Sequence, residues 1–72
     1  MQRAMDMKNV MADYIATVLN ARGIPYHMRP SGNGCVSFTF DDRMVAQSVV
    51  TGIFEDAFSV TSGGCAEAKV TH

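Results

Sequence analysis

The sequence predicts a small α+β domain, a two-layer sandwich in which both helices pack on one face of a three-stranded mixed sheet. Apolar residues recur every three or four positions near residues 7–19 and 42–57, the period of an amphipathic helix. In three shorter segments, near 24–29, 35–40 and 65–71, they alternate with polar residues, the period of a strand. A length of 72 residues allows one domain over 1–72 and no second.

The first helix has a complete set of start and stop signals. Asp6 suits its N-cap, and Arg22 suits the negative end of the helix dipole. Gly23 fits the left-handed position that follows a helix, and Pro25 prevents the helix from continuing. Its apolar face comprises Met7, Val10, Met11, Tyr14, Ile15, Val18 and Leu19.

Two alternating runs joined by a glycine-containing loop, residues 30–34, predict a β-hairpin. If paired residue numbers sum to 64, Met28 faces Val36 and Tyr26 faces Phe38, so the apolar side chains share one face. A phosphate-binding glycine loop is followed by a helix N-terminus, whereas a strand follows this one. The loop is therefore interpreted as a turn.

The second helix, about 42–57, is expected to begin with Asp41 or Asp42 as its N-cap. Its apolar stripe comprises Val45, Ala46, Val49, Val50, Ile53, Phe54 and Ala57. The third strand, about 65–71, follows an irregular segment at 58–64, for which a fourth strand is the open alternative.

The element order is therefore α-β-β-α-β. The segment between the second and third strands is a right-handed crossover, so these two strands should be parallel. The third strand is expected beside the first, which gives the strand order 2-1-3. In that order the strand at 35–40 is an edge.

Composition argues against several classes of function. Six basic and seven acidic residues, scattered along the chain, form no basic stripe, so nucleic acid is not expected as a partner. No apolar run approaches the roughly 18 residues of a spanning helix, so no membrane is expected. The N-terminus lacks the apolar stretch of a signal peptide. The two cysteines are thus expected as reduced thiols in the cytoplasm.

Polar residues of the three strands define the face that the helices do not cover. RNA-binding sheets place aromatic residues on such a face, whereas Tyr26, Phe38 and Phe40 are predicted to point into the core. We expect the uncovered face to bind a protein partner through His27, Arg29, Cys35, Ser37, Thr39, Glu67 and Lys69.

The sharpest chemical alternative is a metal- or thiol-redox-responsive site at His27, Cys35 and Cys65, with His72 as a fourth candidate ligand. His27 and Cys35 would be diagonal neighbours across the hairpin. Their spacing in the sequence is unlike the close pairs of structural zinc sites. In the order 2-1-3, Cys35 and Cys65 would lie two strands apart, too far for a disulfide. No catalytic, cofactor-binding or metal-binding residue is assigned.

The favoured function is a non-catalytic protein-interaction module, a small adaptor or inhibitor of a larger protein whose identity the sequence withholds. As an edge, the strand at 35–40 would either pair with a second copy as a homodimer or accept a partner strand. Methionines give adaptable contacts, and those considered for the contact surface are Met1, Met5, Met7 and Met44. Encoding by a phage or mobile element is a hypothesis suggested by the small size.

Overall fold

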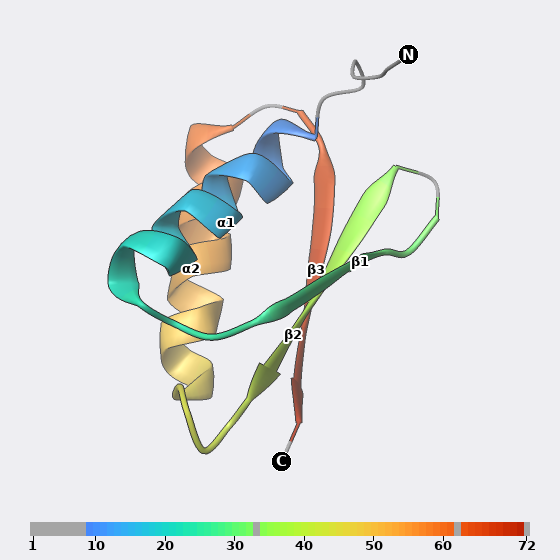
Figure 1. Cartoon of the computed structure of the whole chain (residues 1–72). Coiled ribbons are helices and arrows are strands. Elements are labelled where there is room, and N and C mark those ends of the chain that lie inside the picture. Colours follow the sequence, from blue (N-terminus) through green and yellow to red (C-terminus); the bar gives the residue numbers. More distant parts are fainter. Residues whose placement is uncertain (1–8, 33, 62, 72) are drawn as a thin grey trace.

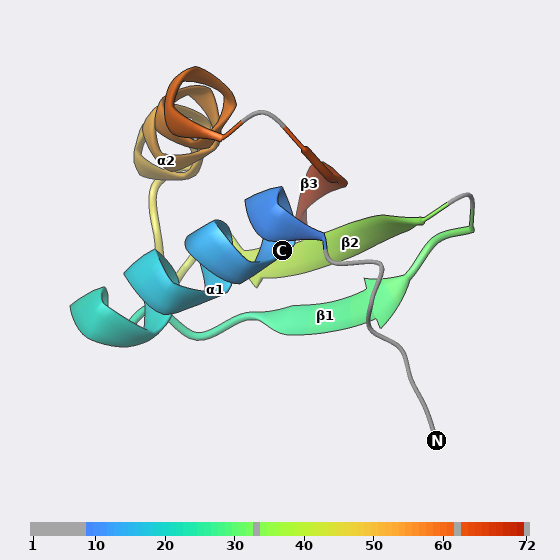
Figure 2. The ribbon, with the colours of Figure 1, turned by 90° about the horizontal axis from the view of Figure 1, so that it is seen from above.

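The structure is a computed structural model that describes residues 9–32, 34–61 and 63–71. Its elements are, in chain order, α1 (Val10–Arg22), β1 (His27–Pro30), β2 (Cys35–Asp41), α2 (Gln47–Val60) and β3 (Cys65–Thr71). Both helices lie on one side of the sheet, and the described residues leave the other side uncovered (Figures 1 and 2). The predicted α+β class, element order and helical layer are confirmed.

Local capping fixes both ends of α1. The side chain of Asn9 is the N-cap and accepts a hydrogen bond from the backbone of Ala12 at 3.0 Å. Gly23 ends the helix in the left-handed conformation, with φ of 70°, as predicted. The expected N-cap, Asp6, lies outside the described residues.

The predicted strand order 2-1-3 is wrong. β2 is the central strand, paired antiparallel with β1 and parallel with β3, so the order is β1-β2-β3. β1 has only four residues and ends at Pro30, which has no N–H with which to bond a strand on its second side. The seven-residue β2 pairs with β3 along its whole length instead. The predicted homodimer through residues 35–40 therefore loses its structural basis, because both sides of β2 are already paired.

The hairpin register also differs from the prediction. Paired residue numbers sum to 66, so that Met28 lies opposite Phe38. The ladder is extended by Ser31 N, which donates to the carbonyl oxygen of Cys35 at 3.0 Å and so tightens the turn. Because the shift is two residues, each side chain keeps its predicted face.

A short turn separates β2 from α2, and the predicted caps are wrong. The N-cap of α2 is Ala46, which makes no side-chain cap hydrogen bond. Asp41 instead ends β2, where its carboxylate accepts from the backbone N–H of Arg43 at 2.9 Å and pairs with the Arg43 guanidinium at 3.1 Å. That local turn uses the carboxylate that we expected to cap the helix.

The core lies between the helices and the covered face of the sheet. Phe38 and Phe40 of β2 are fully buried, and both rings lie nearly perpendicular to that of Phe54 of α2, with centroids 5.7 and 6.3 Å from it. Burial of one such side chain stabilises the fold by about 1.5–3 kcal/mol. The prediction that Tyr26, Phe38 and Phe40 face the core is confirmed.

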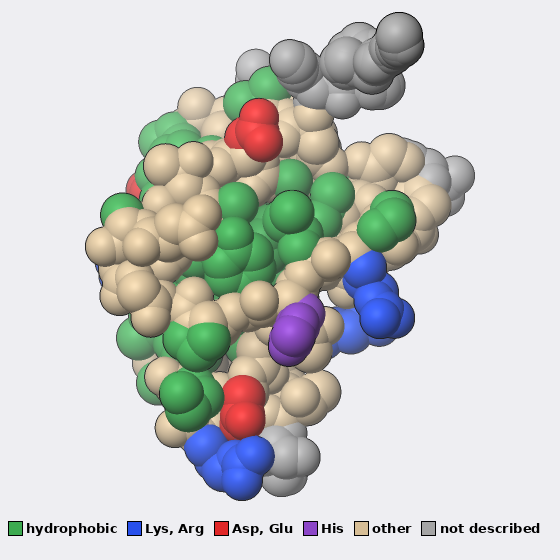
Figure 3. Space-filling view, in the orientation of Figure 1, with side chains coloured by type: hydrophobic (Ala, Val, Ile, Leu, Met, Phe, Trp, Pro, Cys, Tyr) green, Lys and Arg blue, Asp and Glu red, His purple; other side chains and the backbone are tan. Residues whose placement is uncertain are grey.

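One large apolar residue of the covered face stays accessible. Met28 of β1 faces the helical side, yet 53% of its surface is exposed. The backbone of α1 lies closest to α2 and β3 and does not closely approach β1. Apolar side chains are consequently visible between α1 and β1 (Figure 3).

Candidate functional site

The uncovered face of the sheet carries two cross-strand rows of polar residues. In the first row Ser37 of β2 lies between Arg29 of β1 and Glu67 of β3. In the second row Thr39 lies between His27 and Lys69. The structure therefore brings together the residues that the sequence assigned to this face, since the strand period was predicted correctly. Their role in binding remains a prediction.

Ser37 is the buried centre of this face. Only 5% of its surface is exposed, although it lies on the side without helices. Its neighbours on both adjacent strands have long side chains, Arg29 and Glu67. Within the part of the chain that the structure describes, the Ser37 hydroxyl makes no hydrogen bond to a protein group.

A hollow of about 530 Å³ opens over these rows. Its lining residues are His27, Met28, Arg29, Ser37, Thr39 and Lys69. It thus offers two permanent cations, an imidazole and two hydroxyl groups, while no carboxylate lines it. Among the described residues, neither Arg29 nor Lys69 lies within ion-pair distance of an acidic side chain. The chemistry of the hollow suits an acidic group.

Cys35 and Cys65 form a disulfide at one end of the same face, with their Cα atoms 4.5 Å apart. The expectation of two reduced thiols is therefore wrong. The two cysteines meet because of the strand order. β3 lies directly beside β2, and this pairing places Cys65 opposite Cys35. Disulfides persist mainly in oxidising environments, so the basis of the cytoplasmic prediction is lost. The compartment itself stays a prediction.

The proposed metal ligands do not come together. His27 lies opposite Thr39, which is four residues along β2 from Cys35, rather than diagonally beside Cys35. Both sulfur atoms belong to the disulfide, and His72 lies outside the described residues. Across 9–32, 34–61 and 63–71, no group of three or more His, Cys, Asp or Glu side chains could hold a metal ion.

Sequence reasoning missed the residue that holds this end of the sheet to the helical layer. The Asn9 side chain donates to the carbonyl oxygens of Gly34 and Cys65, both at 2.8 Å, and accepts from Cys65 N at 3.1 Å. An asparagine directly before an apolar helical period is a typical N-cap signal, which was available in the sequence. The bonds to β3 were not, because they join residues 56 positions apart.

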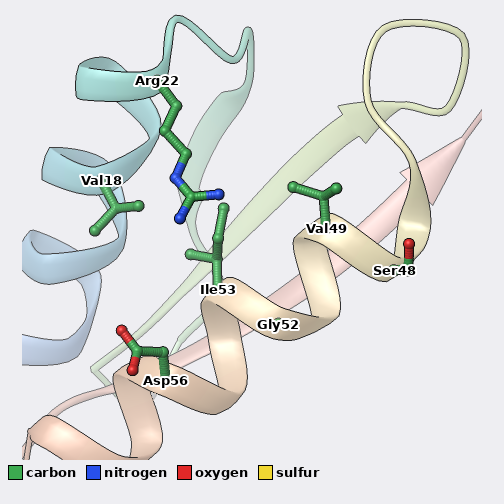
Figure 4. Close-up of a pocket in the computed structure, with 7 residues that line it drawn as sticks. All are labelled: Val18, Arg22, Ser48, Val49, Gly52, Ile53 and Asp56. Carbon is green, nitrogen blue, oxygen red and sulfur yellow. The ribbon is translucent and has the colours of Figure 1, made fainter.

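An open cleft of about 480 Å³ separates α1 from α2 on the opposite side of the molecule from the polar rows. In Figure 4, Arg22 extends from α1 over Ile53, while Asp56 points from α2 toward α1. The Asp56 carboxylate accepts a hydrogen bond from Tyr14. That bond, with smaller contributions from desolvation and the charge of Asp56, raises the pKa of Tyr14 above its ordinary value. The cleft contains no residue of the predicted site.

None of the helices in the described part of the chain has the length and apolar character needed to cross a membrane. Comparison with protein-family models, with curated proteins and with solved structures found no match.

Proposed function

We propose that the protein is a non-catalytic protein-interaction module, a small adaptor or inhibitor, whose uncovered sheet face binds an acidic surface of a larger protein. The observation that supports this most is the hollow lined by Arg29, Lys69 and the hydroxyl groups of Ser37 and Thr39, with no carboxylate in its lining. Glu67 lies beside Ser37 on β3, outside that lining. An origin in a phage or mobile element stays a prediction.

The geometry favours recognition over catalysis. A carboxylate placed above Thr39 would accept a hydrogen bond from its hydroxyl and charge-assisted bonds from Lys69 beside it and Arg29 in the adjacent row. Such groups steer association and fix the register of the partner. The three paired strands fix the backbone positions from which these side chains extend, so the relative placement of the groups is set before a partner binds.

The direct test is capture of a partner from an extract of the native host by the immobilised protein with its disulfide intact. We expect one protein, or a small set, to be retained by the wild type. Arg29→Glu should reduce retention at least tenfold, because it reverses a charge in the hollow. Arg22→Glu is the matched control, since Arg22 lies in the interhelical cleft. Equal retention by Arg29→Glu and the wild type would refute the proposal.

A second candidate function is a response to thiol redox conditions, and the exposed position of the disulfide on this same face favours it. Cys65 is exposed and Cys35 is half-buried, so a thiolate reductant can approach the sulfur atoms. Exchange with two thiols would break the S–S bond, give two cysteine thiols and leave the reductant as a disulfide.

This candidate is tested by equilibration in mixtures of reduced and oxidised dithiothreitol. A regulatory disulfide is expected to have a reduction potential above about −300 mV, whereas a purely structural one lies below it. A value below that limit would remove the redox candidate and leave the interaction module unaffected.

A further inference from the structure

Among the residues that the structure describes, β3 is an edge strand, and its exposed backbone can be assigned residue by residue. Thr71 O accepts a hydrogen bond from Asp42 N at 2.7 Å, on the β2 side. Cys65 N and O bond Asn9, which also bonds Gly34 O just before β2. Successive residues of a strand direct their backbone groups to opposite sides. The N–H and C=O groups that point away from β2 therefore belong to Ala66, Ala68 and Val70.

The opposite edge of the sheet, β1, is less suited than β3 to pairing with an added strand. β1 is four residues long and ends at Pro30, which has no N–H. It also carries Arg29 and His27, and short, charged, proline-containing strands are typical of edges that resist pairing. Of the two edges, β3 is the one equipped to accept another strand.

A groove of about 430 Å³ runs between this edge and α2. On the α2 side its wall includes Phe54, which is buried, and Phe58, of which 67% is exposed. On the β3 side the small residues Ala66 and Ala68 leave room beside Phe58 for larger side chains. The groove thus places the exposed backbone of β3 beside an apolar wall formed by α2.

We propose that this groove binds an extended segment of another protein, which adds to β3 as a fourth strand. Apolar side chains at alternate positions of the segment pack against Phe58 and Phe54. The groove includes the carboxylate of Glu55 and no cation, whereas the Glu67 carboxylate lies on the uncovered face and accepts a hydrogen bond from Ser31. Charge complementarity therefore favours a segment that also carries Lys or Arg. This inference rests on the proposed function, since it gives the interaction module a second surface.

The position of α2 argues for a single strand rather than a second copy of the whole chain. Seen from above, α2 lies on the β3 side of the molecule and further from β1 than β3 itself (Figure 2). Antiparallel pairing of β3 strands from two copies would place both α2 helices over the same junction between those strands. One added strand fits beneath α2, whereas a second helical layer does not.

The test is selection of displayed random ten-residue peptides on the wild-type protein with its disulfide intact. We expect enriched peptides with apolar residues at alternate positions and at least one Lys or Arg. Binding of the synthesised peptides is then measured by fluorescence anisotropy. In hydrogen exchange, the amides of Ala66, Ala68 and Val70 should become protected when a peptide binds.

Two variants address the two walls of the groove. Ala68→Pro removes an outward N–H without removing a bond to β2, and Phe58→Asp places a charge on an exposed part of α2. Each should weaken peptide binding at least tenfold while circular dichroism remains that of the wild type. Val60→Asp is the matched control, because Val60 is 57% exposed on the same helix and does not line the groove. It should change the affinity less than twofold.

The outcomes separate this site from the uncovered face. Arg29→Glu should leave peptide affinity within twofold, so a failure of partner capture by that variant would not affect the groove. Selection of no peptide, or peptides that bind Phe58→Asp as tightly as the wild type, would overturn the inference. A dimer in sedimentation that Ala68→Pro converts to a monomer would also overturn it, since the occupant would then be a second copy.

Discussion

The side-chain amide of Asn9 bonds both backbone groups of Cys65, with Oδ1 3.1 Å from the nitrogen and Nδ2 2.8 Å from the carbonyl oxygen. The same amide caps α1, so one residue fixes the start of the helix to the start of β3. We expect Asn9→Ala to lower the free energy of unfolding by about 2–3 kcal/mol, from loss of a cap and of bonds to the strands. Urea denaturation of the variant and the wild type measures this change in the free energy of unfolding.

Asn20→Ala is the control for that prediction. Asn20 is an exposed residue in the last turn of α1, and its only side-chain contact in the described part of the chain is a long hydrogen bond from Tyr26 at 3.3 Å. Its replacement should change the free energy of unfolding by less than about 0.5 kcal/mol. Equal effects of the two substitutions would contradict the assigned role of Asn9.

The adjacent glycines 63 and 64 provide a second test of this junction. Gly64 has φ of 89°, and a Cβ atom there would lie 2.2 Å from Asn9 Oδ1. Gly64→Ala should therefore destabilise the fold by at least about 1–2 kcal/mol, the cost of the left-handed conformation alone. Gly63→Ala meets no atom within 4 Å and should be nearly neutral. If thermal unfolding gave equal midpoints for the two variants, a close approach between position 64 and Asn9 would be ruled out.

The disulfide closes a loop across 30 residues of sequence. The loss of loop-closure entropy in the unfolded chain predicts a contribution of about 3–4 kcal/mol, a large share of the stability of so small a domain. We expect the Cys35→Ser/Cys65→Ser variant to lose this amount in urea denaturation. A loss below about 1 kcal/mol would mean that the bond is not a main source of stability.

Tyr14 predicts how stability depends on alkaline pH. Because its hydrogen bond to Asp56 raises its pKa, the folded protein holds the phenolic proton more tightly than the unfolded chain does. The contribution is fully present below the unfolded pKa of about 10 and is lost as pH rises through the folded pKa. Urea midpoints between pH 8 and pH 11 should therefore fall less steeply for Tyr14→Phe than for the wild type. Identical pH dependence of the urea midpoints in the two proteins would contradict a contribution of Tyr14 to alkaline stability.

Sequence patterns were sufficient for the elements and for the face of each strand residue. Periods of 3.6 and 2 depend on neighbouring residues, so they identified the cores of both helices and the inward direction of Phe38 and Phe40. A register error of two residues is invisible to such reasoning, since it moves no side chain to the other face. The hydrogen bond between Ser31 and Cys35 decides the register, and it depends on the turn conformation.

The strand order and the disulfide could not be obtained from periodicity. A right-handed crossover satisfies the handedness rule whether β3 pairs with β1 or with β2. The wrong choice separated Cys35 from Cys65 and made β2 an edge. Pro30 was the available signal, because a strand that lacks an N–H suits an edge better than the centre of a sheet.

The central claim, that the uncovered sheet face contacts another protein, is tested most directly by crosslinking in the native host. A photoreactive residue at position 27 would lie on that face, and Arg29 and Lys69 would remain in place. One at position 21, exposed on α1, serves as the control. We predict a discrete crosslinked protein from position 27 and none from position 21. No product from position 27, or the same product from both positions, would contradict the claim.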